Sequence, residues 1–376
     1  MASRLGEVSD LVMGQAPPSK DTNFLGRGTP FVKVGEFADV RPVIREWTTN
    51  PIKIAHRTDV LLCVVGATCG KINLGEECAI GRSVAAIRPH PSKLDQFYLY
   101  YFMMTLVERL RAGSLGAAQT VISKEMVQTV QVPVPPLPEQ RRIVGILDEA
   151  FAGLATAKAN AEKNLQNARA LFESHLQSVF TQHVEGWVET TLGEVCEFVG
   201  GSQPPKSVFS TKQSVDNIRL IQIRDYKSDK HIVYIPRAQA RRFCSADDVM
   251  IGRYGPPLFQ ILRGLDGAYN VALMKAVPDE SRISRDLLFY FLKHSTILEY
   301  VIYHSNRAAG QIGLTKETLE PYPIRLPPLA EQKRVVATIS FLESETQRLE
   351  ALYQQKLAAL DALKKSLLHQ AFAGQL

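Results

Sequence analysis

The residues best suited to chemistry in this chain are three cysteines that lie close together. Cys63, Cys69 and Cys78 could bind a metal ion, because thiolates are good zinc ligands. Their spacing matches no zinc-binding pattern, no fourth ligand is obvious, and the five cysteines of the chain form no CxxC pair. We therefore interpret these thiols as packing groups of strands in a protein of a reducing compartment, and predict no metal site.

No other set of residues supports catalysis by this chain. The sequence has no GxGxxG, Walker A or DExx-box signature, and neither a Ser/His/Asp set nor a carboxylate pair stands out. Gly255-Pro256-Pro257-Leu258-Phe259 has the outline of the Asn/Asp-Pro-Pro-aromatic motif of amino-methyltransferases. Its first residue lacks the side-chain oxygen that would accept hydrogen bonds from a target amine, and no cofactor loop precedes it. We expect a turn there and no enzymatic activity of the chain by itself.

The net positive charge of the chain is confined to two stretches. The 376 residues hold 44 Lys and Arg against 38 Asp and Glu, a net charge of +6. Residues 1–133 hold 15 against 12 and residues 186–325 hold 18 against 15, whereas 134–185 hold 5 against 6 and 326–376 hold 6 against 5. A basic surplus in two stretches suits contact with phosphate, although a solvated basic surface accounts for it equally well.

Composition is that of a globular protein large enough for two or more cores. Hydrophobic residues make up 45% of the chain, and no apolar run approaches the ~18–20 residues of a membrane span. The first ten residues carry no signal-peptide pattern. We expect a cytoplasmic protein without membrane contact.

The chain contains one sequence pattern twice. Pro135-Pro136-Leu137-Pro138-Glu139-Gln140 returns 192 residues later as Pro327-Pro328-Leu329-Ala330-Glu331-Gln332. Further matching pairs lie 187 to 192 residues apart: Leu5–Val8 with Leu192–Val195, Gly14 with Gly201, Phe31–Val34 with Leu220–Ile223, Asp59–Leu61 with Asp248–Met250, Gln119–Lys124 with Gln311–Lys316, and Phe180 with Phe372. Such a repeat predicts two copies of one structural unit. The segments between the matches differ, notably 71–80 and 260–269, so we expect the two copies to recognise different targets.

Each copy ends in a segment with the pattern of a long helix. From Glu139 to Phe180 no proline occurs, and apolar or small residues recur at intervals of three and four, as they do from Glu331 to Phe372. Such a seam is typical of a coiled coil. Each helix would be about 65 Å long at 1.5 Å per residue. We predict that the two helices pair antiparallel within the chain; an intermolecular coiled coil is the alternative.

The segments before the helices alternate short strands with helix. The predicted strands of the first copy include Val60–Val65 and Val84–Arg88, and the predicted helices are Leu94–Arg111 and, in the second copy, Ile283–Ile302. We predict the α+β class: two globular domains of mixed sheet and helix, joined by two long antiparallel coiled-coil helices in a pseudo-twofold arrangement. The predicted boundaries are 1–136 and 183–328 for the globular domains, and 137–182 and 329–376 for the helices.

This arrangement resembles the specificity subunit of type I restriction–modification enzymes. The resemblance covers nearly the whole chain and rests on the phrase Pro-Pro-Leu-x-Glu-Gln, present twice between a variable segment and a long helix. Two further motifs support it: Asp59-Val60-Leu61-Leu62 leading to Gly66-Ala67-Thr68-Cys69-Gly70-Lys71, and Gln119–Lys124 with its twin Gln311–Lys316. In the second copy Gly255-Pro256-Pro257-Leu258-Phe259-Gln260 replaces the glycine-rich loop, which is a departure from the pattern.

The resemblance implies a DNA-recognition subunit that is not an enzyme. Its globular domains would be two target recognition domains, each holding one half of a split, asymmetric sequence in double-stranded DNA, with the helices as a spacer. Two modification subunits, which bind S-adenosylmethionine and methylate adenine, would dock on the helices and domains. Restriction subunits would join them for cleavage driven by ATP and Mg. The chain itself would hold no cofactor.

The residues that would read bases can be predicted only as a chemical class. Lys and Arg suit guanine edges and Asn and Gln suit adenine, while either group can also hold phosphate. Our candidates are Lys33, Arg45, Arg57, Lys71 and Gln119 in the first copy, and Gln222, Arg224, Arg241, Arg253 and Gln311 in the second. For any single one of them, a solvated surface residue is the more common case.

A coiled-coil scaffold with two protein-binding heads is the alternative function. Basic heads and divergent loops favour DNA recognition, whereas DNA binding insensitive to salt and sequence would favour the scaffold. A start at Met1 and a full second helix favour a whole subunit over a fragment of a fused enzyme.

Overall fold

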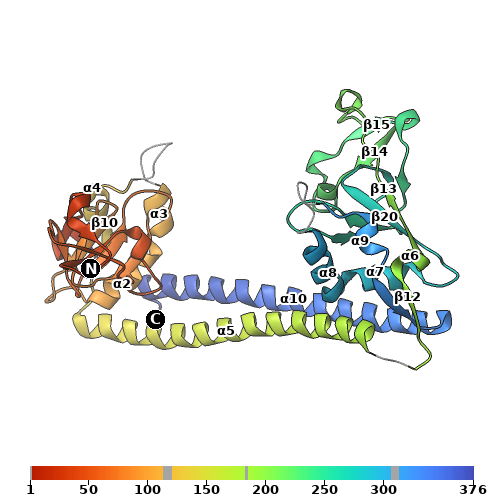
Figure 1. Cartoon of the computed structure of the whole chain (residues 1–376). Helices are drawn as coiled ribbons and strands as arrows, with labels where there is room; N and C mark the ends of the chain where they lie inside the picture. The colour runs from red at the N-terminus through yellow and green to blue at the C-terminus, as the bar shows by residue number, and fades with distance from the viewer. Residues whose placement is uncertain (1, 113–120, 183–184, 306–312) are drawn as a thin grey trace. The chain divides into compact units, whose positions relative to one another are not determined.

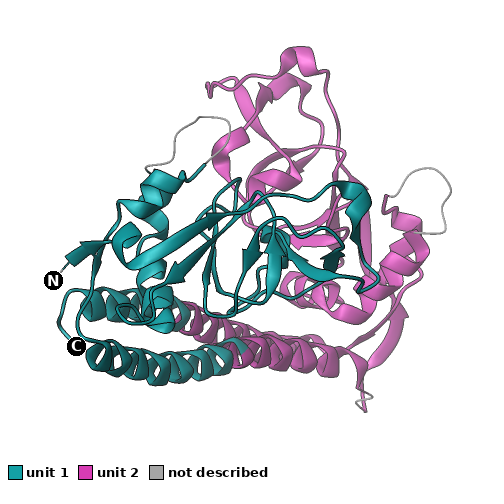
Figure 2. Cartoon of the chain, turned by 90° about the vertical axis from the view of Figure 1, so that its left-hand side faces the viewer, with its two compact units in different colours: residues 1–162, 355–376 teal, residues 163–354 magenta. Residues whose placement is uncertain are grey.

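The computed structural model describes residues 2–112, 121–182, 185–305 and 313–376. These residues form two compact units: unit 1 is Met1–Glu162 with Gln355–Leu376, and unit 2 is Lys163–Gln354 (Figure 2). Both unit boundaries fall inside the long helices. Each unit therefore contains one globular segment, the first part of one helix and the last part of the other. The boundaries predicted after residues 136, 182 and 328 separate globular segments from long helices, whereas the unit boundaries cut through the helices. The predicted boundaries therefore stay predictions.

Unit 1 is layered around an antiparallel sheet of order β2-β10-β7-β8. The residues of its central strand β7 alternate between two cores: Val60 and Leu62 face the helices, while Leu61 and Cys63 face a second sheet. Burial on both faces explains why this strand is a continuous apolar run. The bounds are β2 (Ser9–Met13), β10 (Val84–Pro89), β7 (Val60–Cys63) and β8 (Ile72–Leu74).

The second sheet of unit 1 has the order β3-β5-β4-β9-β6 and contains one parallel pair, β4 with β9. Its strands are β3 (Thr22–Asn23), β5 (Glu46–Thr48), β4 (Thr29–Val32), β9 (Cys78–Ile80) and β6 (Ile54–Ala55). The remaining elements are β1 (Ala2–Arg4) paired with β11 (Gln131–Pro133), α1 (Leu5–Val8), α2 (Gln96–Thr105), α3 (Val107–Ala112) and α4 (Lys124–Gln128).

Unit 2 repeats this plan. Its antiparallel sheet has the order β13-β20-β17-β18, its second sheet has the order β15-β14-β19-β16, and β14 pairs parallel with β19. The strands are β13 (Cys196–Gly200), β20 (Leu273–Pro278), β17 (Val249–Gly252), β18 (Gln260–Leu262), β15 (Tyr234–Pro236), β14 (Asn217–Ile221), β19 (Gly267–Tyr269), β16 (Phe243–Cys244), and β12 (Val188–Thr191) paired with β21 (Pro323–Leu326). The short helices are α6 (Leu192–Val195), α7 (Arg285–Lys293), α8 (Ser295–Ser305) and α9 (Lys316–Leu319).

The two long helices are α5 (Leu137–Thr181) and α10 (Leu329–Phe372), which run side by side in Figure 1. They pair antiparallel within the chain, as predicted. In unit 1 the Lys158 ammonium lies 3.2 Å from the Asp361 carboxylate, and in unit 2 the Arg169 guanidinium lies 2.8 Å from that of Glu350. The α+β prediction, with two globular parts joined by long helices, is confirmed.

Each helix predicted in the globular segments is in fact two helices. The predicted helix Leu94–Arg111 divides at Leu106 into α2 and α3, and the predicted helix Ile283–Ile302 divides at His294 into α7 and α8. His294 has an extended backbone, with ψ of 148°, and its ring is buried beside Phe180 and Phe291. Because both helices of a pair pack on the same core, the apolar spacing in the sequence continues through the break.

The repeated proline phrase ends in a buried glutamine that ties each long helix to its globule. The Gln140 side chain accepts a hydrogen bond from the Asp95 amide (2.8 Å) and donates to the carbonyls of Lys93 and Pro135 (both 2.8 Å). In unit 2 the Gln332 side chain accepts from the Ser284 amide (2.7 Å) and donates to the carbonyls of Arg282 (2.8 Å) and Pro327 (3.1 Å). Both side chains are fully buried, so these groups have no water to replace the bonds.

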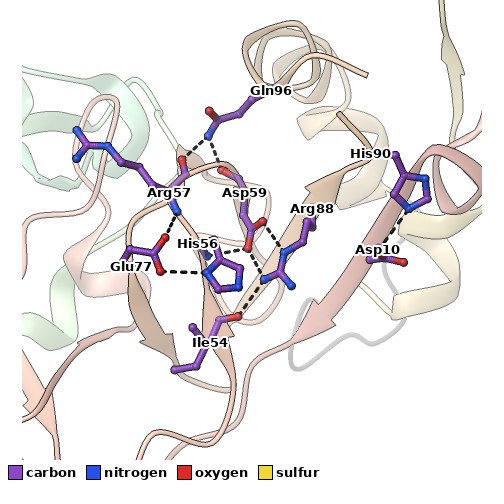
Figure 3. Close-up of polar contacts among 9 residues, drawn as sticks. All are labelled: Asp10, Ile54, His56, Arg57, Asp59, Glu77, Arg88, His90 and Gln96. Atoms are coloured by element: carbon purple, nitrogen blue, oxygen red, sulfur yellow. Dashed lines mark hydrogen bonds and ion pairs between the residues drawn. The ribbon is translucent and has the colours of Figure 1, made fainter. Parts of the chain in front are cut away.

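The repeated aspartate of the Asp-Val motif closes the turn before β7 or β17. The buried Asp59 carboxylate accepts hydrogen bonds from the His56 amide and the Arg88 guanidinium (all 2.9 Å), and Gln96 donates to the Asp59 carbonyl (2.9 Å; Figure 3). In unit 2 Asp248 accepts from the Ser245 amide (2.8 Å) and from Lys275 (3.2 Å). Burial would raise the pKa of Asp248, but these two partners lower it below its usual value. The repeated motif is therefore a structural turn.

Candidate nucleic-acid interface

The basic surplus of each globule lies in the segment that builds its second sheet. Residues 206–242 hold nine Lys and Arg against three Asp and Glu, and residues 19–57 hold seven against four. These segments include β14 and β15 in unit 2 and β3 to β6 in unit 1. The surplus of positive charge in each segment matches or exceeds that of its whole globule. In each unit the second sheet is therefore a better candidate for contact with phosphate than the first sheet.

In unit 1 the sequence candidate Lys33 lies in a pocket of about 700 Å³ at the ends of the parallel strands β4 and β9. Its ammonium pairs with the buried carboxylate of Glu46 and lies 5.5 Å from the ring of Phe31. Arg82 and Ser83, which follow β9, also line the pocket. A cation, a carboxylate, a hydroxyl and an aromatic face can together contact the edge and the face of a base.

A buried carboxylate holds the backbone beneath Lys33. The Lys33 amide donates to the Glu36 side chain (2.9 Å) across the short 3-10 turn Val34–Glu36. The second candidate, Arg45, lies beside this turn and donates to the Gly35 carbonyl (3.3 Å). Lys33 and Arg45, 12 residues apart in the sequence, are thus brought to the same turn.

Unit 2 has the same turn with different side chains. Gln222 takes the place of Lys33, and its amide donates to the Asp225 carboxylate (3.0 Å) across the turn Ile223–Tyr226. Burial raises the pKa of Asp225 above its usual value. The Gln222 side-chain nitrogen is buried and has no hydrogen-bond partner. The equivalent position therefore offers a neutral amide, where unit 1 offers a cation.

Unit 2 has two further candidate cations, Arg224 on the turn Ile223–Tyr226 and Arg253 after β17. The exposed candidate Arg224 shares a pocket of about 510 Å³ with Lys230 and His231. Arg253 lies at the end of β17, where its guanidinium donates to the carbonyls of Leu314 (2.9 Å) and Val271 (3.5 Å) and lies 5.5 Å from the Tyr254 ring. Val271 occupies the position of Arg82, 189 residues earlier. The Arg253 guanidinium of unit 2 thus lies beside the residue that corresponds to Arg82 of unit 1.

The other candidates lie apart from these clusters or outside the description. Arg57 is on the turn before β7, where its amide donates to Glu77 (3.0 Å; Figure 3). Its guanidinium lies 4.0 Å from the Glu76 carboxylate. Lys71 and Arg241 are exposed loop residues. Gln119 and Gln311 lie outside the described residues, so their predicted role stays a prediction.

Sequence reasoning missed several residues of these sites: Arg82, Ser83, Lys230, His231 and Tyr254. The basic surplus of residues 206–242 would have pointed to this segment if the net charge had been counted over single sheets instead of whole globules. No such signal pointed to Arg82, because the second copy has a valine, Val271, at the corresponding position.

The cysteines are packing residues. All five are buried and unpaired, and the described residues include no group of three metal-ligating side chains. Burial raises the pKa of Cys78 to about 12, which keeps its thiol protonated. Within the described ranges, no helix has the length and apolarity to cross a membrane.

Comparison with known proteins gives consistent matches along the chain. The sequence profile described as the type I restriction modification DNA specificity domain matches residues 1–165 and 184–358. A protein of Methanocaldococcus jannaschii, described as the type I restriction enzyme MjaX specificity subunit, is 30% identical over 161 residues, which are 42% of this chain and 37% of that protein. The type I restriction enzyme EcoBI specificity subunit of Escherichia coli is 22% identical over an alignment of 418 residues that covers 99% of this chain and 85% of the relative.

The fold also has a match among solved structures. A chain from a structural study of complex assembly and conformational transition in a type I R-M system superposes with a TM-score of 0.82 at 22% identity. The superposition covers 100% of this chain and 98% of that chain. At this identity the likeness concerns the fold.

Proposed function

Because the chain belongs to the family of type I restriction–modification specificity subunits, we propose that it recognises DNA for such a complex and performs no reaction itself. In this proposal each globule binds one half of a split, asymmetric sequence in double-stranded DNA, and the helices α5 and α10 act as the spacer between the halves. The chain would work in the cytoplasm, which suits its five unpaired thiols.

One observation carries this proposal: a single fold is present twice, with different side chains at the same strand ends. Lys33 and Gln222 occupy equivalent positions on equivalent turns, each fixed by a buried carboxylate. A cation favours guanine edges and phosphate, whereas an amide favours adenine. Two copies with the same backbone and different polar groups are what recognition of two different half-sites requires.

The partners follow from the family. Two modification subunits, which would bind S-adenosylmethionine and supply adenine methylation, are proposed to dock on the long helices and the globules. Restriction subunits with ATP and Mg would complete the complex. Helix α5, which is 45 residues long, continues without a break from unit 1 into unit 2, so its exposed side is open to such partners in both units.

Mapping of DNA methylation tests the proposal directly. The full chain would be produced together with its modification subunit in a host that lacks DNA methylation, and modified adenines would be located by sequencing. We expect one split, asymmetric motif with a fixed gap. A stable complex of the two proteins that leaves the DNA unmodified, and binds it without regard to sequence or salt, would contradict the proposal and favour a scaffold with two protein-binding heads.

A further inference from the structure

Unit 1 exposes two large apolar side chains at the tip of the loop that connects β3 to β4, the strands on either side of β5. Phe24 and Leu25, between β3 and β4, are 75% and 73% exposed. Single exposed apolar residues are common on protein surfaces, but two adjacent large ones on one turn are not accounted for by the fold. The described part of this unit has no other exposed pair of adjacent large apolar residues of this degree.

Hydrogen bonds and a required glycine fix the backbone conformation of the tip, which keeps these two side chains exposed. The Asn23 side-chain oxygen accepts hydrogen bonds from the amides of Leu25 (3.0 Å) and Arg27 (3.1 Å), and its nitrogen donates to the Arg27 carbonyl (2.9 Å). A Cβ atom on Gly28, whose φ is +91°, would overlap the Thr48 carbonyl oxygen, so this position requires glycine. A turn that is ordered in advance loses little conformational entropy when it binds.

The surroundings of the tip suit a polyanion. Lys20 and Arg27, which flank the apolar pair in the sequence, are both exposed, and the one acidic residue between them, Asp21, accepts a hydrogen bond from the Asn50 side chain (3.1 Å). Ser19 and Thr22, just before the tip, line the pocket that contains Lys33. An apolar turn with a cation before and after it in the sequence, beside a polar pocket, fits a ligand with charged edges and an apolar interior. A DNA duplex is such a ligand: phosphates on the outside and stacked bases within.

We propose that Phe24 and Leu25 form a wedge that inserts between stacked bases of the half-site held by unit 1. Proteins that bend or open DNA use apolar side chains in this way, and the insertion partly unstacks the step. This inference rests on the proposed function and deepens it. An unstacked step beside the recognition pocket would lower the cost of extruding a nearby adenine for methylation by the partner subunit.

The corresponding tip of unit 2 is a natural comparison. It carries Val215, which is 95% exposed, and its loop is held by a hydrogen bond from the Lys212 amide to the Ser210 hydroxyl (3.0 Å). A single short, branched side chain cannot fill the space between two base pairs as phenylalanine and leucine can. We therefore expect unstacking in the half-site of unit 1 and little in the half-site of unit 2.

The test uses the full chain in complex with its modification subunit and duplexes that carry the mapped target. 2-Aminopurine is placed in one half-site or the other, because its fluorescence rises when it is unstacked. The variant is Phe24→Ala/Leu25→Ala. Matched controls are Val40→Ala/Val43→Ala, two apolar residues of the same globule that are 51% and 50% exposed, and Val215→Ala. Thermal unfolding and co-purification check that each variant folds and assembles.

The wedge variant should bind the target about 10- to 100-fold more weakly, since burial of one large apolar side chain is worth about that factor. It should lose the fluorescence rise in the first half-site and keep the salt dependence of binding, which counts phosphate contacts. A mismatch at the inserted step should recover most of the loss. The control variants should behave like the natural chain.

Three results would overturn the wedge. One is unchanged affinity and fluorescence in the variant; another is a loss that the mismatch does not recover; the third is failure to bind the modification subunit, which would make the tip a protein contact. Failure of the proposed function is distinguishable, because the natural chain itself would then show no sequence-specific binding.

Discussion

The two units of this protein agree where the backbone must be held and differ where a ligand could be contacted. Gln140 and Gln332 make the same three kinds of hydrogen bond, and the carboxylates of Asp59 and Asp248 cap the same turn. At the strand ends, by contrast, Lys33 is replaced by Gln222. Within the described parts of the two units, identity therefore marks structural positions, and the residues that read a target are expected among the differences.

The ends of the long helices extend the comparison. Helix α10 ends in unit 1, where the ring of Phe372 lies 5.3 Å from that of Phe102. Helix α5 ends in unit 2, where the ring of Phe180 lies 5.2 Å from that of Phe291. The repeated phenylalanine thus packs against a phenylalanine of the globular segment in each unit. In both cases it belongs to the long helix that began in the other unit.

The largest effect is expected when the shared glutamine is removed. Gln140→Leu leaves the Asp95 amide and two carbonyls buried without partners, and Gln332→Leu does the same in unit 2. Three lost bonds to buried groups should cost about 3 kcal/mol or more of unfolding free energy. If the units are equivalent, the two variants should lose similar amounts of unfolding free energy.

The two tryptophans allow each unit to be followed separately in urea. Trp47 lies in unit 1 and Trp187 in unit 2, so variants with one tryptophan replaced by phenylalanine report one unit each. Gln355→Leu in unit 1 and Gln166→Leu in unit 2, both at exposed helix positions, are the controls. If only one unit lost unfolding free energy, the glutamine of the repeated phrase would stabilise that copy alone.

A smaller effect is expected from making the site of unit 1 resemble that of unit 2. The double variant Lys33→Gln/Glu46→Gln removes both charges of the pair, so no buried carboxylate is left without its partner. Loss of one specific base contact is worth about 1–3 kcal/mol of discrimination. Methylation mapping should show a changed base preference in one half-site and none in the other.

The control for this exchange is Lys93→Gln, because Lys93 is exposed, is not one of the base-reading candidates and does not line the pocket of Lys33. It should leave the recognised motif intact. A change in both half-sites after the double substitution would contradict the assignment of one half-site to each unit.

The sequence was sufficient for the parts that depend on periodicity and repetition. The intervals of three and four from Glu139 to Phe180 predicted α5, and the matched phrases predicted two copies of one plan. It was insufficient where a residue's role depends on a distant partner. Gln140 repeats visibly, but its bonds reach residues 45 and 47 positions away. Arg82 has no counterpart in the repeat, and the break at His294 depends on a core that both flanking helices share.

The smallest effect should separate the units by pH. His294 is buried in unit 2, and counting from the helix caps Asp95 and Ser284 the same position of unit 1 holds Thr105. Burial lowers the pKa of His294 below its usual value of 6.5. Below pH 6.5 the unfolded chain therefore binds a proton that the folded unit does not yet accept, so the stability of unit 2 should fall until the lowered pKa is passed.

The loss should be smaller than the effects expected above, because it rests on the titration of a single group. It would be measured as the difference in urea midpoint between pH 7 and pH 5, with Trp187 as the probe. His294→Thr should reduce this pH dependence towards that of unit 1, while His304→Thr, at an exposed position on α8, should not. If the two units lose stability equally on acidification, and His294→Thr changes nothing, the buried histidine does not distinguish them.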